Sequence, residues 1–231
     1  MKIKLSIIAS LAMPSLVMAQ TILINYTNSS NTVTGQPETW NNYTGTPQGS
    51  SIANLVDING SLTGISMETT NAFAGVNSSG TTSASAPYPS TATGTSFYDA
   101  NDQWTNPGDA MGVLEFSGLD VNKTYSFTLY ASRITSEDRS TLYTLQGANS
   151  GSDTLNPSDN VTNTVLISDI APTAGGIITL TVTPGATNAN SNDFIYLGVA
   201  EISAIPEPST IALGMAGIAF VGSIYWRRRK A

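Results

Sequence analysis

Short runs in which apolar and polar residues alternate recur through the middle of the chain, and they restrict its fold more than any other feature. The clearest run is Lys123–Arg133, in which Tyr125, Phe127, Leu129 and Ala131 share one face and mostly Thr and Ser residues occupy the other. Successive side chains of a β-strand point to opposite faces of the sheet, so this pattern predicts a strand with one buried face. Helix-period stretches are missing from this part of the sequence.

Seven further segments are expected as strands: Thr21–Tyr26, Ile52–Ile58, Gly112–Phe116, Thr141–Gln146, Asn163–Ile170, Gly176–Thr183 and Phe194–Ser203. Turn-forming residues separate them, as in Asn59-Gly60, Asn106-Pro107-Gly108 and Thr183-Pro184-Gly185. Many short one-sided strands in residues 20–204 predict an all-β fold, an antiparallel β-sandwich or jelly roll. The polar segments Thr27–Ser51 and Asn77–Ser96 are expected to be long loops.

The N-terminal residues have the layout of a secretory signal peptide. Lys2 and Lys4 precede an apolar stretch, Leu5–Val17, and small or apolar residues lead up to Ala19. This predicts a signal peptide helix over residues 1–19, cleaved after Ala19. The body, residues 20–204, is therefore expected to lie outside the cytoplasm.

The C-terminal residues 205–231 are expected to form a second targeting segment. Pro206, Glu207 and Pro208 precede an uncharged apolar run, Ile211–Trp226, which as a helix spans about 24 Å. With Ser209 and Thr210 added, residues 209–226 are a predicted transmembrane helix for a hydrocarbon core of about 30 Å. Four basic residues then form a predicted cytoplasmic membrane stop: Arg227, Arg228, Arg229 and Lys230.

This order of motif, apolar helix and terminal basic cluster closely resembles the PEP-CTERM sorting signal of Gram-negative, often biofilm-forming bacteria. The resemblance covers only the tail of the chain. It implies recognition of Pro206, Glu207 and Pro208 by an exosortase, a membrane-embedded protease-like enzyme that is thought to cleave near the motif. A plain tail anchor behind a proline-stiffened linker is the alternative interpretation.

The body also resembles a known module. Gly118-Leu119-Asp120, the run KTYSFTLYASR from Lys123, Glu137-Asp138-Arg139 and the run TLYTLQGAN from Thr141 are similar to a module of secreted bacterial proteins. The resemblance implies a galactose-binding-like jelly roll whose own activity is unassigned.

Composition excludes several functions. The chain has no Cys and no His, which excludes disulfides, Ser-His-Asp and Cys-His catalysis and ordinary zinc sites. The body has only three cations, Lys123, Arg133 and Arg139, against 15 acidic residues from Glu38 to Glu201, a net charge of −12. Such a surface repels nucleic acid, which is therefore not an expected partner.

Aromatic residues of the predicted loops are candidates for stacking on sugar rings, although they also commonly close the ends of a sandwich core. The strongest candidates for glycan binding are Trp40, Asn41 and Asn42, together with Asp102 and Trp104. Three more aromatic residues are expected in loops: Tyr43, Tyr88 and Tyr98.

Two of the three body cations, Arg133 and Arg139, flank Glu137 and Asp138. The favoured interpretation is an ion-paired hairpin in which Arg133 is tied to Asp138 or another acid. The alternative is a bidentate clamp for a carboxylate or a sugar acid.

Oxygen ligands of the kind that Ca²⁺ accepts gather in Asp99, Asn101, Asp102 and Asp109. The EF-hand register fails, because the twelfth position from Asp99 is Ala110 and not a glutamate. Solvated acidic turns are the default interpretation, a structural calcium is the alternative, and no other cofactor is expected.

The sequence thus predicts an exported surface or extracellular-matrix protein, anchored once in the lipid bilayer and then processed by an exosortase-like partner, after which it stays at the cell surface or outside the cell. It is expected to be a substrate and not an enzyme. Two alternatives remain: a carbohydrate-binding module acting on exopolysaccharide, and a carboxylate-based polysaccharide hydrolase.

Overall fold

The computed structural model describes residues 20–101 and 110–206. Residues Ala19–Ile205 form one compact unit. The predicted signal peptide, transmembrane helix and basic stop fall outside the described residues. Within the described ranges, no helix is long and apolar enough to cross a membrane.

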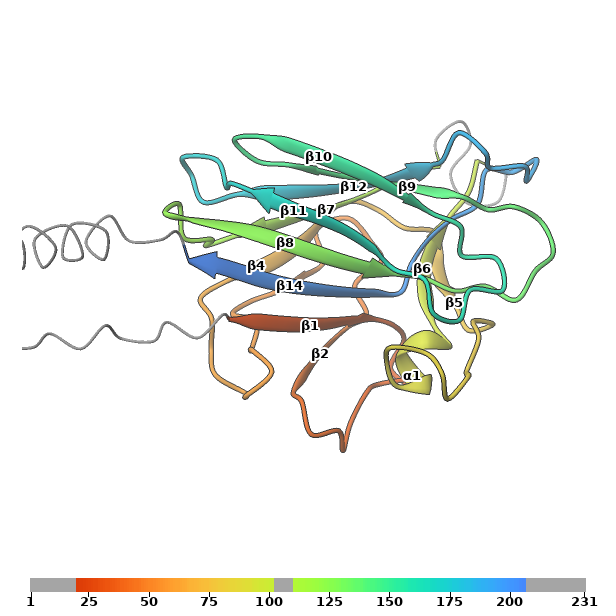
Figure 1. Cartoon of the computed structure of the whole chain (residues 1–231), viewed down its shortest axis with the longest axis horizontal. Helices are drawn as coiled ribbons and strands as arrows, with labels where there is room; N and C mark the ends of the chain where they lie inside the picture. Colours follow the sequence, from red (N-terminus) through yellow and green to blue (C-terminus); the bar gives the residue numbers. More distant parts are fainter. Residues whose placement is uncertain (1–19, 102–109, 207–231) are drawn as a thin grey trace, which may run out of the picture. The chain divides into compact units, whose positions relative to one another are not determined.

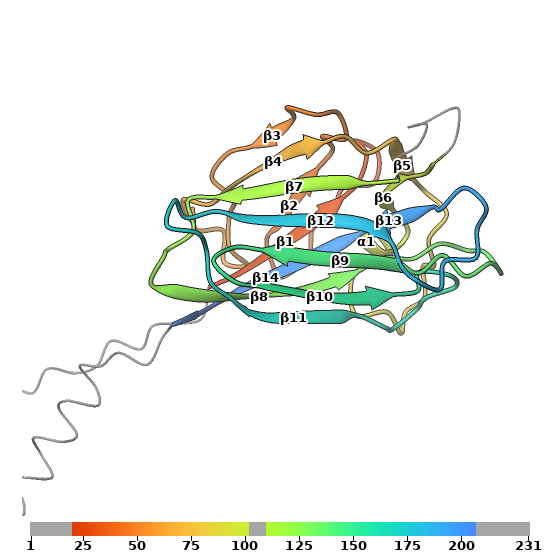
Figure 2. The ribbon, with the colours of Figure 1, turned by 90° about the horizontal axis from the view of Figure 1, so that it is seen from above.

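The body is all-β, and its two larger sheets pack face to face as a sandwich (Figures 1 and 2), which confirms the predicted fold class at this level. One sheet has five strands in the spatial order β11, β8, β14, β1, β2. Their bounds are Val165–Ile170 for β11, Lys123–Tyr130 for β8, Val199–Pro206 for β14, Thr21–Tyr26 for β1 and Trp40–Tyr43 for β2.

The other large sheet has six strands in the order β10, β9, β12, β7, β4, β3, and Figure 2 shows it from above. The bounds are Ser150–Leu155 for β10, Thr141–Gln146 for β9, Ile178–Pro184 for β12, Gly112–Ser117 for β7, Ser66–Asn71 for β4 and Ser51–Ile52 for β3.

A small third sheet lies at one end of the sandwich. It has the order β13, β6, β5, with β13 at Ile195–Leu197, β6 at Ser96–Asp99 and β5 at Gly75–Asn77. A single short helix, α1 at Ser90–Thr93, precedes β6 in the described part of the chain.

The core lies between the two large sheets and consists of the faces that the alternating patterns predicted. Tyr125, Phe127 and Leu129 of β8 are at most 2% exposed. Phe127 meets Phe116 of β7 edge-on, with 5.3 Å between ring centroids, an arrangement that aromatic pairs favour. Further core residues come from the inward faces of several other strands, among them β1, β9, β11, β12 and β14.

One pair of strands departs from the antiparallel expectation. β1 and β2 run parallel, with Leu23 opposite Trp40 and Tyr26 opposite Tyr43. Parallel neighbours need a long crossover connection, and the segment between Tyr26 and Trp40 supplies one. The predicted loop Thr27–Ser51 is therefore wrong in part, because it contains β2.

Two predicted strands have different bounds for local reasons. The segment Ile52–Ile58 is not one strand: Asn54 has a φ of 56°, and the Asp57 carboxylate accepts hydrogen bonds from the backbone N–H groups of Asn59 and Ser61, which makes a turn. Phe194–Ser203 divides at Gly198 into β13 and β14, which belong to different sheets.

Candidate functional site

The chain leaves the sandwich through a central strand. β14 lies between β8 and β1 and pairs with β1 from Val199 opposite Asn25 to Ser203 opposite Thr21. The Ala204 N–H then donates to the Gln20 carbonyl at 2.9 Å. Pro206 is the last residue of β14, so the predicted sorting motif begins where the paired strand ends. Glu207, Pro208 and the basic stop lie outside the described residues.

Asn41 and Asn42 were predicted to bond glycan hydroxyls. In the structure, their side chains form hydrogen bonds with other groups of the protein. The Asn41 amide donates to the carbonyls of Leu23 and Val56 at 3.0 and 2.8 Å, and its oxygen accepts from the Val56 N–H at 2.9 Å. Asn42 bonds both backbone groups of Val33 and accepts from the Asn25 amide. Both amides thus connect β2 to neighbouring segments.

Trp40 lies in β2 and not in a loop as predicted. The sequence Trp-Asn-Asn-Tyr does not show the alternation by which the other strands were predicted. The Trp40 ring meets that of Tyr88 edge-on at 5.9 Å, and Tyr88 in turn meets Tyr130 at 5.8 Å. The indole Nε1 is buried and has no hydrogen-bond partner among the described residues.

The other predicted glycan residues are distributed differently. Tyr43 also lies in β2 and Tyr98 in β6, so both loop assignments were wrong, whereas Tyr88 is in a loop. The Tyr88 hydroxyl donates to Glu201 at 3.2 Å, and burial together with this carboxylate raises the pKa of Tyr88. Asp102 and Trp104 lie outside the described residues.

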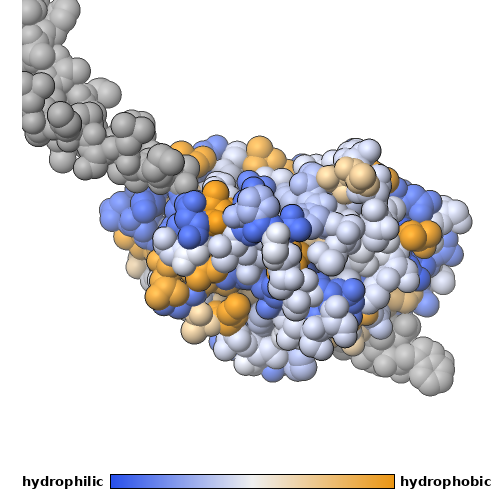
Figure 3. Space-filling model, turned by 90° about the horizontal axis from the view of Figure 1, so that it is seen from below, coloured by the Kyte–Doolittle hydropathy of each residue, from blue (hydrophilic) through white to orange (hydrophobic). Residues whose placement is uncertain are grey.

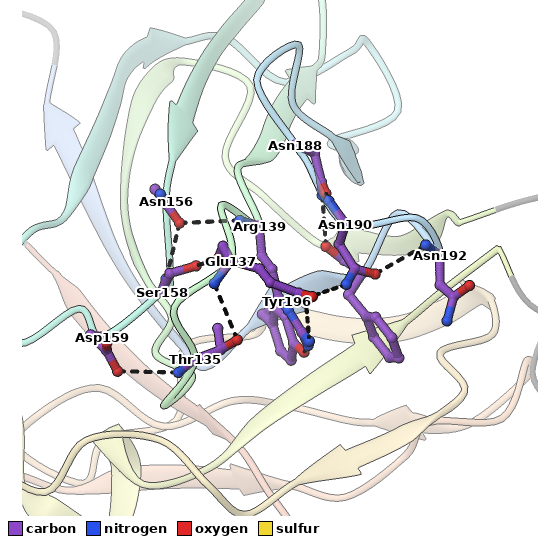
Figure 4. Close-up of polar contacts among 11 residues, drawn as sticks. Thr135, Glu137, Arg139, Asn156, Ser158, Asp159, Asn188, Asn190, Asn192 and Tyr196 are labelled. Carbon is purple, nitrogen blue, oxygen red and sulfur yellow. Dashed lines mark hydrogen bonds and ion pairs between the residues drawn. The ribbon is translucent and has the colours of Figure 1, made fainter.

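Arg139 lies in a cluster of polar and aromatic side chains, which Figure 4 shows in close-up. Its guanidinium pairs with Glu137 at 3.1 Å and donates to the Tyr196 hydroxyl. It also lies 4.7 Å from the ring centroid of Phe194, which is stacked on Tyr196. Only 12% of the Arg139 side chain is exposed.

Hydrogen bonds from Asn190 and Arg139 lower the pKa of Glu137, and burial raises the pKa of Tyr196. An ion pair is present in this hairpin, but it joins Arg139 to Glu137, and among the described residues Arg133 is not paired with Asp138 as predicted. Asp138 instead accepts from the N–H and the hydroxyl of Ser140, and Arg133 donates to the Asn77 side-chain oxygen at 2.5 Å. The donors that a sugar-acid clamp would use at Arg139 are thus largely engaged.

A shallow polar groove of about 490 Å³ lies beside β2 and β3. Asn42, Thr44, Ser50 and Ser51 contribute its polar lining. Thr44 and Ser51 are exposed. This groove has the size of a small-ligand site, and of the predicted glycan residues it includes Asn42 and Tyr43.

A second depression, of about 200 Å³, brings together two carboxylates that the sequence did not single out. Glu68 of β4 and Glu115 of β7 stand opposite each other in the register. The strand register alone joins these distant positions, so no local sequence signal could have found them. Glu68 is exposed and Glu115 is half-buried. In a two-carboxylate glycosidase, by contrast, an apolar environment keeps the general acid protonated.

The predicted calcium ligands are only partly within the described residues. Asp99 is buried and its Oδ2 accepts from the Met111 N–H at 3.2 Å, while Asp102 and Asp109 fall outside. No group of three or more acidic residues that could hold a metal occurs in residues 20–101 and 110–206. The structural calcium stays a prediction.

Comparison with known protein families finds a match for the C-terminal segment. Residues 204–230 match the model of the PEP-CTERM protein-sorting motif, as the sequence predicted. A motif of this class implies export and C-terminal membrane anchoring through the segment that carries it. No curated protein matches the chain.

Solved structures resemble the body only distantly. The ANXUR1 extracellular domain from Arabidopsis thaliana is 16% identical with a TM-score of 0.42, and the match covers 80% of this chain but 48% of that one. A structure of TmCBM61 in complex with beta-1,4-galactotriose is 10% identical with a TM-score of 0.27, covering 62% of this chain and 84% of that one. The chain spans about half the length of the ANXUR1 domain.

Proposed function

We propose that the chain is an exported cell-surface or extracellular-matrix protein whose C-terminal segment is a substrate of an exosortase. The matched sorting motif at residues 204–230 carries the proposal. The signal peptide pattern of residues 1–19 supports export, and the apolar run followed by Arg227–Lys230 supports a halt in the membrane.

The body would then be cargo, and the chain a substrate and not a catalyst. Proline disfavours helix at the residue before it, so Pro206 and Pro208 keep the motif extended for a protease to bind. The absence of Cys and His from the whole sequence leaves no nucleophile–histidine pair that would make the chain itself a protease.

The test is the intact mass of the mature protein from its native host, compared with a Glu207→Ala variant. We expect the native protein to end near Pro206-Glu207-Pro208 and the variant to keep residues 211–231. A Glu38→Ala variant, which removes an exposed body carboxylate, is the matched control and should be processed normally. Retention of the tail in both the native protein and the variant would contradict the proposal.

A second candidate function is exopolysaccharide binding, for which the 490 Å³ polar groove beside β2 is the supporting observation. Affinity electrophoresis with polysaccharide from the host tests it. Substitution of the exposed hydroxyls, Thr44→Val with Ser51→Ala, should restore free mobility. Trp40→Phe should not, because the Trp40 ring packs against Tyr88. Equal retardation of all variants would place binding elsewhere.

A further inference from the structure

One end of the sandwich carries both the beginning of β1 and the end of β14, as Figure 1 shows at the left of the body. The Ile58 N–H donates to the Thr21 carbonyl at 2.9 Å, and Val56 forms a β-bridge with Leu62. The turn from Asp57 to Leu62 therefore belongs to the same end of the sandwich as the β14 terminus.

The turn between β7 and β8 lies at this end too. A Cβ added to Gly118 would come within 2.4 Å of the Gly64 carbonyl oxygen, so the two backbones are in contact. β8 begins at Lys123 and is a neighbour of β14 in the sheet. Val121 belongs to the turn just before β8, and Figure 1 shows the beginning of β8 beside the end of β14.

Large exposed hydrophobic side chains concentrate at this end. Leu62 is 68% exposed, Val121 51% and Ile205 41%, and we call these three residues the apolar end surface. In the described part of the chain, only Ile134 and Leu166 are comparably exposed. Leu166 lies opposite Thr128 and Ile134 follows the end of β8, so both are toward the other end of that strand. Figure 3 shows hydrophobic patches toward the left end of the body in that view. Single exposed apolar residues are ordinary, but their concentration at one end is informative.

The number of residues between the end of β14 and the predicted membrane span indicates what can cover this surface. β14 ends at Pro206, and the predicted membrane span begins at Ser209. Three extended residues reach about 10 Å at most. The headgroup region on each side of the hydrocarbon core is only about 5 to 8 Å thick. The end of the body therefore stays within a few Å of the headgroup layer whenever the tail is inserted.

We propose that the apolar end surface of Leu62, Val121 and Ile205 contacts the lipid headgroup layer before the tail is processed. This inference rests on the proposed function, because it requires the tail to be membrane-inserted. The same end also carries Asp57, Asp120 and Lys123, with Asp120 and Lys123 paired at 3.4 Å. Since the body is strongly acidic, the favoured lipid surface is zwitterionic and not anionic.

The test uses the full chain in nanodiscs of phosphatidylcholine that contain a headgroup-attached nitroxide quencher. The natural chain has no Cys, so single-cysteine variants can be labelled with a fluorophore without background. Leu62→Cys, Val121→Cys and Ile205→Cys report on the end surface. Ile134→Cys and Leu166→Cys are the matched controls, at exposed apolar positions elsewhere.

Quenching at the three end positions together with unquenched controls is the expected result. Insertion of a flexible Gly-Ser linker of about ten residues between Ile205 and Pro206 should then abolish the quenching while the chain stays in the nanodisc. Equal quenching at all five positions, or none at any, would overturn the contact.

Co-purification of the chain with the nanodisc is measured first. It distinguishes failure of the proposed membrane tail from failure of the proposed headgroup contact. A chain that fails to insert would overturn both the membrane tail and the contact. An inserted chain whose end positions are not quenched would overturn the contact alone.

Discussion

At the scale of single residues, Asn41 was predicted to bind a glycan but instead forms hydrogen bonds that stabilise the fold. It is 5% exposed and satisfies three backbone groups of Leu23 and Val56. We expect Asn41→Ala to lower the free energy of unfolding by about 2–4 kcal/mol, because buried backbone groups lose their partners. Chemical denaturation measures this loss.

The matched control is Asn59→Ala, which removes an exposed asparagine side chain at the Asp57–Ser61 turn. Its effect should stay within about 0.5 kcal/mol. Equal losses for the two variants would mean that the amide contacts of Asn41 contribute little.

Glu137 gives a pH-dependent prediction at the same scale. Hydrogen bonds from Asn190 and from Arg139 hold the pKa of Glu137 below its usual range. A lowered pKa contributes stability that is present above the unfolded-state pKa, about 4.3, and is lost as the pH falls through the folded-state value. Glu137→Gln should therefore be less stable than the natural protein at pH 7, and this difference should shrink as the pH falls toward 3.

Urea denaturation midpoints at the two pH values measure this difference, with Glu38→Gln as an exposed control. A difference that persists unchanged at low pH would show that the carboxylate charge of Glu137 is not its cause.

At the scale of elements, the turn between β7 and β8 depends on Gly118. Its φ is 78°, and an added Cβ would collide with the Gly64 carbonyl oxygen. Gly35 has a similar φ of 69° but open space around the position of its Cβ. Gly35→Ala should cost about 1 kcal/mol for the left-handed backbone alone, and Gly118→Ala clearly more.

Thermal unfolding of both variants measures the two costs. Equal shifts of the midpoint would mean that the backbone at Gly64 moves aside without cost, and that the contact between the two turns is not tight.

The strands that sequence alone could predict are those whose inward faces are apolar. Thr21–Tyr26 and Thr141–Gln146 coincide with β1 and β9. β4 escaped prediction because an inward position is the buried polar Thr69, and β10 because an edge strand of sequence SGSDTL has only one buried residue. Polar inward positions are satisfied by contacts with distant residues, and these are invisible in a local pattern.

The same reasoning applies to the candidate sites. The sorting motif was predictable because its parts are contiguous in the sequence. The partners of Arg139 were not, because Phe194 and Tyr196 are far from it in the sequence and approach it only through contacts between β9 and β13, such as the hydrogen bond from the Tyr143 hydroxyl to the Tyr196 carbonyl. The opposition of Glu68 and Glu115 likewise depends on the register between β4 and β7.

At the scale of the whole molecule, the folded body ends where the processing motif begins. A protease acting at Pro206-Glu207-Pro208 would have to approach within a few residues of the sandwich. We expect a Gly-Ser linker of about ten residues inserted before Pro206 to speed the removal of the tail in the host. Pulse–chase labelling measures the rate.

An insertion of the same linker after Gly35, an exposed position, is the control and should leave the rate unchanged. Slower processing with the linker before Pro206 would indicate that the protease uses the sandwich end for recognition.

The central position of β14 has a mechanical consequence. A pull on the tail runs along the axis of a strand that is hydrogen-bonded to a neighbour on each side, β8 and β1. Such a load shears many backbone bonds at once, whereas a load on an edge strand peels them one by one. We expect single-molecule pulling through residue 206 to require a markedly higher force than pulling through β10 at the edge of the six-stranded sheet. We therefore expect a body tethered through β14 to unfold less readily under drag from flowing liquid than one tethered through an edge strand.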